Sequence, residues 1–330
     1  MITTFRRRAA AATAAAALAF GLVSCADDAG TSAEGNGATE TIQVEDNQGT
    51  QTVALPLDSV ISTDNRTFRT LEDWGVELSA APVGLMPENL GYKTDDSIVD
   101  LGNHREPNLE AIVAAEPDLI INGQRFAQYY EDIKALTPDT PILDVNVREG
   151  EPFDEELRRQ TRLLGEVFGK EDEAEELVAE FDESIQRVRD AYDPEDTVMG
   201  VITSGGNVNY AAPGSGRTLG PAFDILGLTP ALEVDNATTD HQGDDISVEA
   251  IADSNPDIML VMDRDAAVGP AEGEEYVPAN ELLRDSAALR NVTAVTEDRI
   301  IYMPQYTYVD EGIQTYTEFF NALADALEQD

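Results

Sequence analysis

The sequence predicts an α/β protein made of two Rossmann-like lobes joined by a single long helix. Residues 109–121 and 248–260 are two copies of one phrase, 139 residues apart. In each copy Glu-Ala-Ile favours helix, Pro-Asp after four intervening residues ends it, and a short apolar strand follows. Each copy lies in a stretch where short apolar runs alternate with helical ones, and one long amphipathic segment separates the two stretches. Two lobes of like plan are the simplest architecture for this pattern.

Residues 1–24 have the features of a lipoprotein signal peptide. Three arginines (6–8) precede an apolar run from Ala9 to Phe20, which is too short to span a bilayer. The segment Leu22-Val23-Ser24-Cys25 resembles a bacterial lipobox, so Cys25 is expected to carry lipid. It is the only cysteine, and an internal disulfide is therefore excluded. Export by the general pathway or by the twin-arginine pathway remains open.

Residues 25–50 are expected to form a flexible tether between the lipid and the lobes. They are rich in Ala, Asp, Gly, Thr, Asn and Glu and show no apolar periodicity. Without the signal peptide, 18 basic residues stand against 65 acidic ones, a net charge of −47. Such acidity excludes nucleic acid as a partner. It also makes any cluster of the few arginines informative, because a cationic pocket is unexpected in so acidic a protein and would indicate a binding site.

The N-terminal lobe is expected over residues 51–168. Its predicted order is a strand at 60–61, a helix over 67–74, a strand at 82–84, the first copy of the repeat, a strand over 141–145 and a helix over 153–168 that ends at Gly169. Strands that alternate with helices along the chain predict a mostly parallel sheet.

A spine helix is expected over residues 169–195, and the C-terminal lobe over 196–330. Apolar side chains recur at helical spacing from Ala174 to Tyr192, and a helix over 171–192 would be about 33 Å long. The C-terminal lobe is predicted to contain a strand over 198–203, a helix ending near Gly227, the second copy of the repeat, a strand over 300–303 and a closing helix over 315–327.

Arg125 and Arg264 are the first candidate binding residues. Each lies eight residues beyond the repeated proline, just past the end of equivalent strands. The carboxyl ends of parallel strands are where open α/β sheets bind ligands. A guanidinium stays charged and binds paired oxygens, so the pair predicts an anion site between the lobes.

These features together resemble the iron-siderophore substrate-binding lipoproteins of ABC importers, which are class III substrate-binding proteins. The likeness runs from about residue 55 to the C-terminus and is strongest to the branch that binds petrobactin and other catecholate siderophores. It rests on the lipobox and on the order of the segments 106–112 (Glu-Pro-Asn-Leu-Glu-Ala-Ile), 117–121 (Pro-Asp-Leu-Ile-Ile), 213–217 (Pro-Gly-Ser-Gly-Arg), 241–243 (His-Gln-Gly), 246–251 (Ile-Ser-Val-Glu-Ala-Ile) and 262–267 (Met-Asp-Arg-Asp-Ala-Ala).

The resemblance implies a function and a set of partners. The chain would be an extracytoplasmic lipoprotein, anchored to the bacterial cell membrane, that captures a ferric siderophore, with the catecholate type favoured, and delivers it to an ABC permease. It would act as a monomer, would be no enzyme, and would hold no intrinsic cofactor. The native siderophore and the permease are not identified by the sequence.

The resemblance also implies site residues. Arg125 and Arg217 match two cleft arginines of the family, each with one extra residue nearby, and Arg264 matches the third without a gap. His241 is similar to a loop histidine that ligates iron when the siderophore leaves coordination positions open. Tyr308 is most similar to a tyrosine with the same role. The family's neighbouring tryptophan is absent here, so Tyr306 remains a competitor.

Three other functions can be compared with this pattern. A haem receptor could use His241 and Tyr308 as axial ligands while the arginines hold the propionates. A secreted hydrolase is disfavoured, because neither G-x-S-x-G nor H-E-x-x-H occurs. Direct capture of a divalent metal is disfavoured too, since the chain has only two histidines, and His104 reads as a turn residue.

Overall fold

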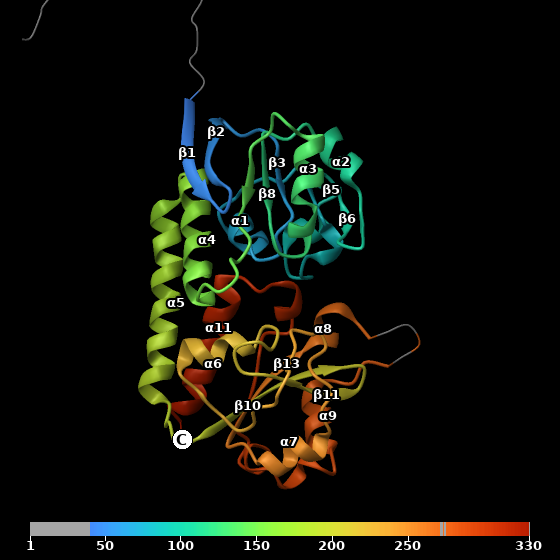
Figure 1. Cartoon of the computed structure of the whole chain (residues 1–330), viewed down its shortest axis with the longest axis vertical. Helices are drawn as coiled ribbons and strands as arrows, with labels where there is room; N and C mark the ends of the chain where they lie inside the picture. Colours follow the sequence, from blue (N-terminus) through green and yellow to red (C-terminus); the bar gives the residue numbers. More distant parts are fainter. Residues whose placement is uncertain (1–39, 271–272, 274, 330) are drawn as a thin grey trace, which may run out of the picture. The chain divides into compact units, whose positions relative to one another are not determined.

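Two mostly parallel sheets, one in each lobe, form the framework of the computed structural model (Figure 1). The structure describes residues 40–270, 273 and 275–329. The predicted signal peptide and Cys25 lie outside these residues. Within the described part of the chain, no helix has both the length and the apolar character that a membrane crossing requires.

The N-terminal lobe is built on a five-stranded parallel sheet in the order β5-β4-β3-β8-β9. Apolar clusters cover both faces of this sheet. The strand expected at 82–84 lies two residues earlier, because Pro82 has no N–H to donate and the ladder ends before it. The lobe comprises β3 (Val60–Ser62), α1 (Phe68–Asp73), β4 (Ala80–Ala81), η1 (Val83–Leu85), η2 (Gly91–Thr94), β5 (Val99–Asp100), β6 (Gly102–Asn103), β7 (Glu106–Pro107), α2 (Leu109–Ala114), β8 (Leu119–Asn122), η3 (Gln124–Tyr129), α3 (Tyr130–Leu136) and β9 (Ile142–Asp144).

Residues 40–50 do not belong to a tether, which corrects the expected boundary. Strands β1 (Glu40–Asp46) and β2 (Gly49–Leu55) pair as an antiparallel hairpin. Val44 and Val53 are buried in the N-terminal core. The alternation of Ile42 and Val44 with polar residues is the strand signal that the compositional reading of this segment missed.

The C-terminal lobe is built on a sheet in the order β11-β10-β13-β14, in which only β11 is antiparallel to its neighbour, and β12 pairs with β10. Its two faces are covered as well. The lobe comprises β10 (Thr197–Ser204), β11 (Asn207–Ala211), α6 (Gly220–Leu226), β12 (Thr229–Pro230), α7 (Val248–Ser254), β13 (Ile258–Asp263), α8 (Arg264–Val268), α9 (Ala279–Asp285), η4 (Leu289–Asn291), α10 (Thr293–Thr296), β14 (Ile300–Tyr302), η5 (Thr307–Val309) and α11 (Ile313–Leu327).

The chain passes between the lobes along a helix hairpin. The predicted long helix is α5 (Glu171–Ala191), and α4 (Phe153–Phe168) lies antiparallel beside it (Figure 1). Gly169 makes the reversal with a left-handed φ of 62°. Leu157 of α4 packs in the C-terminal core, whereas Leu164 of the same helix packs in the N-terminal core. A helix that belongs to both cores resists bending between them.

A second connection lies at the start of α11, a part of the C-terminal lobe that bonds to the N-terminal lobe. Thr70 of α1 donates to Gln314 at 2.8 Å, and Gln314 donates to Asp73 at 2.9 Å. Asn65 donates to the Val309 carbonyl at 2.9 Å. The segment around the start of α11 therefore links the C-terminal lobe to the N-terminal lobe.

The two copies of the repeat are equivalent in detail. The side chains of Asn108 and Ser247 cap α2 and α7 by accepting from the backbone N–H three residues on. The residue before the repeated proline is left-handed in both copies, with φ of 45° at Glu116 and 44° at Asn255. The repeat therefore places β8 and β13, and whatever follows them, at corresponding edges of the two sheets.

Candidate functional site

Arg125 follows β8 at the carboxyl edge of the N-terminal sheet, as the repeat predicted. It lies in η3, after Gly123, where a Cβ atom would stand 2.1 Å from the carboxylate of Asp64. No side chain larger than hydrogen fits there, so the backbone turns directly from strand into η3. The Arg125 guanidinium donates to the Tyr308 carbonyl at 3.2 Å, which links the two lobes.

Arg264 occupies the equivalent place in the C-terminal lobe, at the first residue of α8 after β13. Asp263 caps that helix by accepting from the Ala266 N–H at 3.1 Å. The Arg264 guanidinium forms a 3.1 Å ion pair with Asp265 and donates to the Ser204 hydroxyl at 3.3 Å. Arg264 therefore has a fixed direction before any ligand arrives.

Arg217 comes from the tight loop between β11 and α6. A Cβ atom on Gly216 would lie 2.4 Å from the Ala212 nitrogen, and the next residue but one, Thr218, is left-handed with a φ of 64°. The Arg217 guanidinium forms a 3.0 Å ion pair with Glu311. Burial opposes its charge, but Glu311 and the Tyr308 phenol raise the pKa of Arg217 above its ordinary value.

The three arginines converge on the ring of Tyr308. Their guanidinium carbons lie 4.9 Å (Arg125), 4.7 Å (Arg217) and 4.9 Å (Arg264) from the ring centroid. The Nε atom of each arginine is buried and has no hydrogen-bond partner among the described residues. Three cations from both lobes therefore meet at one ring, with donors that are still unpaired.

Tyr308 is 5% exposed, and burial by itself would raise its pKa. The positive charges of Arg125 and Arg217, together with hydrogen bonding by Arg264, outweigh that effect and lower the pKa of the Tyr308 phenol below its ordinary value. A phenol in this state releases its proton to solvent more readily than a free tyrosine does, and the resulting phenolate can bind a hard cation.

Tyr306 and Tyr308, the two candidate tyrosines, lie in different surroundings. The Tyr306 hydroxyl donates to Glu318 and accepts from Arg69 at 3.2 Å. Burial and the hydrogen bond to Glu318 raise the pKa of Tyr306 to about 12. Tyr306 is thus engaged with another ion pair, and Tyr308 is the tyrosine at the arginine cluster.

His241 lies beside the cluster on the loop before α7, and its side chain is 40% exposed. Burial comes first in lowering the pKa of His241; Asp240 opposes this, and the charges of Arg264 and Arg217 add to it. The neighbouring Gln242 donates to the Ser204 hydroxyl at 3.1 Å, which ties this loop to the Arg264 side of the site. His241 is therefore a partly exposed imidazole near Arg264 and Arg217.

Sequence reasoning treated His104 only as a turn residue. It does lie in the turn between β6 and β7, but burial and the charges of Arg125, Arg105 and Arg217 lower its pKa, as does His241. Its Nδ1 atom is buried and has no partner among the described residues. Both histidines of the chain thus lie near the cluster, which no local motif around His104 indicated.

Glu311 is the second residue that sequence reasoning missed. Its side chain is 6% exposed and accepts hydrogen bonds from Gln124 at 2.9 Å, Arg217 at 3.0 Å and Thr218 at 2.5 Å. Burial opposes its charge, but Arg217 and Arg66 lower the pKa of Glu311 to about 2. The one sequence feature that could have indicated a role for Glu311 is its position three residues after Tyr308.

The arrangement suits a compact anion that presents several oxygens to both lobes at once. A guanidinium group can form two parallel hydrogen bonds with paired oxygens, and all three guanidinium groups lie at the ring of Tyr308. Among the described residues, no group of three or more His, Cys, Asp or Glu side chains is placed to hold a metal ion.

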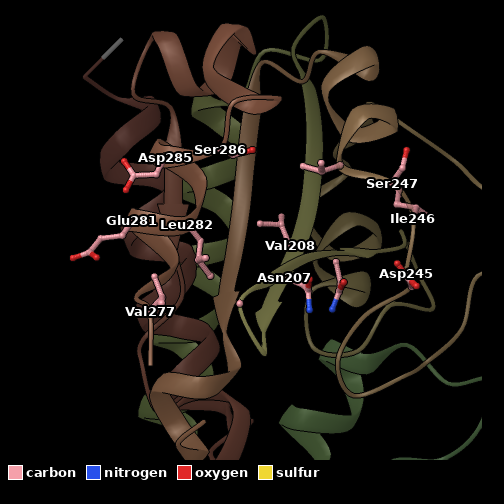
Figure 2. A pocket seen from close by; sticks show the side chains of 13 residues that line it. Asn207, Val208, Asp245, Ile246, Ser247, Val277, Glu281, Leu282, Asp285 and Ser286 are labelled. Carbon is pink, nitrogen blue, oxygen red and sulfur yellow. The ribbon is translucent and has the colours of Figure 1, made fainter. Parts of the chain in front are cut away.

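A separate hollow of about 560 Å³ lies between β11, α7 and α9, away from the arginines. Figure 2 shows Glu281, Leu282 and Asp285 on one side of it and Asp245 on the other. Its charged lining residues are all acidic, so it would repel the anion that the arginine cluster attracts.

The chain is similar to known proteins over most of its length. A family model described as "Periplasmic binding protein" matches residues 60–307. The petrobactin-binding protein YclQ of Bacillus subtilis is 26% identical over 288 residues, which is 86% of this chain and 86% of the relative. The ferric-anguibactin-binding protein FatB of Vibrio anguillarum is 30% identical over 263 residues, 78% of this chain and 80% of the relative.

The crystal structure of YclQ has the same fold. It matches with a TM-score of 0.74 at 24% identity, and the match covers 88% of this chain and 100% of that one. The predicted class, two Rossmann-like lobes joined by one long helix, is thereby confirmed.

Proposed function

Because the chain belongs to the periplasmic binding protein family, we propose that it is the extracytoplasmic receptor of an ABC importer and captures a ferric siderophore. It delivers the complex to the permease and carries out no chemical turnover. The relatives described as binding petrobactin and ferric anguibactin support this ligand class. Haem is not favoured, because neither of these relatives is described as binding it.

The convergence of Arg125, Arg217 and Arg264 on Tyr308 carries the proposal. Catecholate oxygens bound to Fe³⁺ hold the negative charge of the complex, and three fixed cations match them without contacting the siderophore backbone. A charge-assisted hydrogen bond contributes about 1.5–3 kcal/mol. Three such bonds supply a large part of the roughly 12 kcal/mol that nanomolar affinity requires.

Direct ligation of iron is the part of the proposal that belongs to His241 and Tyr308. Fe³⁺ in a complex with four siderophore oxygens has two open coordination positions, and a phenolate is a hard ligand that suits it. The lowered pKa of Tyr308 supports this role. With a hexadentate siderophore both residues would remain outside the coordination shell.

The anchor is proposed from the lipobox alone. Lipid on Cys25 would hold a monomeric receptor at the outer side of the cell membrane, and residues 26–39 would separate the lipid from the hairpin β1–β2. Cys25→Ser should release the protein from the membrane fraction without changing its ligand affinity. Retention of the Cys25→Ser protein in the membrane would show that another segment anchors it.

A calorimetric titration with a panel of ferric complexes tests the proposed function. The panel contains hexadentate and tetradentate catecholates, a neutral ferric hydroxamate and hemin, each with an apo-siderophore control. Tight binding of an anionic ferric catecholate and weak binding of the neutral chelate are expected. Tight binding of hemin with a shift of its Soret band would contradict the proposal, as would binding of no ferric complex at all. In a separate assay, release of product from a panel of esters would indicate a hydrolase instead.

A further inference from the structure

Glu311 is a carboxylate at the site that accepts hydrogen bonds from both lobes. From the N-terminal lobe it accepts a hydrogen bond from Gln124 at 2.9 Å, and from the C-terminal lobe it accepts from Arg217 at 3.0 Å and Thr218 at 2.5 Å. Gln124 immediately precedes Arg125 in η3. One buried group therefore fixes Arg217 directly and the residue adjacent to Arg125 as well.

The surroundings of Glu311 make this bond network costly to rearrange. The side chain is 6% exposed, so a carboxylate that lost its donors would be left buried and unpaired. Asp64 and Arg66 approach from the loop after β3, Arg125 from η3, Arg217 from the loop before α6 and Tyr316 from α11.

Arg66 supplies a second positive charge to Glu311 from the N-terminal lobe. Its guanidinium carbon lies 5.8 Å from the centroid of the Phe153 ring, and its Nε and Nη1 atoms are buried without hydrogen-bond partners among the described residues. The charge of Arg66 contributes to lowering the pKa of Glu311, after the effect of Arg217. Arg66 is therefore a second cation that opposes the cost of burying the Glu311 charge.

We propose that Glu311 is a positioning residue that sets Arg217 and Arg125, which come from different lobes, at the spacing needed to bind one anion. It does not contact the ligand. Its reach matters as well as its charge, because a single carboxylate has to meet Gln124 and Arg217 at the same time. The inference rests on the proposed function for the identity of the ligand, but its first test needs no ligand.

The pKa of Tyr308 depends on how far the guanidinium groups lie from its ring, so it can be used to detect their movement. An opposite charge within about 4–6 Å shifts a pKa by about 1–3 units. The Tyr308 pKa is read from the phenolate ultraviolet absorbance as pH rises, after subtraction of the same titration of Tyr308→Phe. Two roles for Glu311 then give opposite results.

The variants Glu311→Asp and Glu311→Gln separate the two roles. Asp keeps the charge but is one methylene too short to meet both donors, and Gln keeps the length but loses the charge. If Glu311 positions Arg217, Glu311→Asp should raise the Tyr308 pKa by about one unit, because a guanidinium moves away from the ring while the carboxylate charge is kept. Glu311→Gln should raise it less, because loss of the negative charge opposes the change. If Glu311 contributes only its charge, Asp should leave that pKa unchanged and Gln should lower it, which would overturn the proposal.

A second variant avoids disturbing the buried carboxylate. Gln124 is left-handed, with a φ of 47°, and Asn tolerates that conformation while its shorter amide does not reach Glu311. Gln124→Asn should raise the Tyr308 pKa by a smaller amount than Glu311→Asp does. The matched control is Glu318→Asp on α11, whose carboxylate pairs with Arg69 and not with the cluster. It should leave the Tyr308 pKa unchanged.

Ligand affinity completes the test. Glu311→Asp and Gln124→Asn should each weaken binding of an anionic ferric catecholate about 10-fold, with Glu318→Asp equal to the parent protein. If the Tyr308 pKa rises as expected in the variants but the parent protein binds no ferric complex, the proposed function is refuted and the positioning role of Glu311 is kept. A Tyr308 pKa that does not rise in either Glu311→Asp or Gln124→Asn would refute the positioning role whatever the ligand is.

Discussion

Removing Arg125 and removing Arg217 should have similar effects on binding and different effects on stability. Arg217 pairs with the buried Glu311, whereas no carboxylate of the described residues pairs with Arg125, which donates to the Tyr308 carbonyl. Each change to alanine removes at least one charge-assisted hydrogen bond to the ligand, worth about 1.5–3 kcal/mol. Since 1.4 kcal/mol is a factor of ten, Kd should rise about 10- to 150-fold in both variants.

The two variants should differ in their free energy of unfolding. Arg217→Ala leaves Glu311 without its ion-pair partner, and breaking a buried pair on one side typically costs about 3–5 kcal/mol. Gln124 and Thr218 still donate to Glu311 and Arg66 remains nearby, so we expect a loss of about 2–3 kcal/mol, at or below the lower end of that range. Arg125→Ala leaves no carboxylate of the described residues without its ion-pair partner, so it should lower the free energy of unfolding by about 1 kcal/mol, the value of an ordinary hydrogen bond.

Urea unfolding and calorimetric titration on the same preparations measure both quantities. Arg162→Ala is the matched control, because Arg162 lies on α4 and pairs with the exposed Glu175, away from the site. It should leave the affinity unchanged. Unchanged affinity in both Arg125→Ala and Arg217→Ala would sink the assignment of the site, and equal losses of stability in the two variants would refute the account of Glu311.

The remaining predictions concern iron ligation, a buried acid and lobe movement. The double variant His241→Ala, Tyr308→Phe should weaken binding of tetradentate ferric complexes at least tenfold more than hexadentate ones, and should alter the visible charge-transfer band of the former only; equal losses would exclude direct ligation. Burial raises the pKa of Asp310 to about 6, so the folded state holds this proton where the unfolded chain releases it near pH 4, and stability falls as pH rises from 4 to 6. Asp310→Asn should therefore be more stable than the parent by on the order of 2 kcal/mol in urea at pH 7.5 and equal to it below pH 4, and equality at both values would contradict the shift. Free and loaded protein should give nearly the same scattering curve, because α4 belongs to both cores, and a change of several ångströms in radius of gyration would count against this.

The local elements follow from the sequence because their signals are local. The repeat placed β8 and β13, and therefore the positions of Arg125 and Arg264, since proline disfavours helix at the residue before it. The long helix α5 was evident from its apolar periodicity. The hairpin β1–β2 was missed because its short alternation follows directly on a stretch of tether-like composition.

The contacts of the site required the tertiary structure. Sequence placed Arg217 on a loop but gave no means to see that its partner is Glu311, 94 residues later. The choice between Tyr308 and Tyr306 depended on Glu318 and Arg69, which lie on two different helices. The approach of His104 to the arginines depends on how the turn between β6 and β7 faces η3.

By itself the sequence determined the class of fold, the internal repeat and the chemistry of the three arginines. Those properties depend on residue type and on spacing along one chain. Tertiary structure alone decided which groups share a buried volume, because the pairing of Glu311 with Gln124 and Arg217 is set by the packing of two lobes against one helix hairpin. A buried charge is stable only beside its partners, and partners from distant segments meet only in the folded chain.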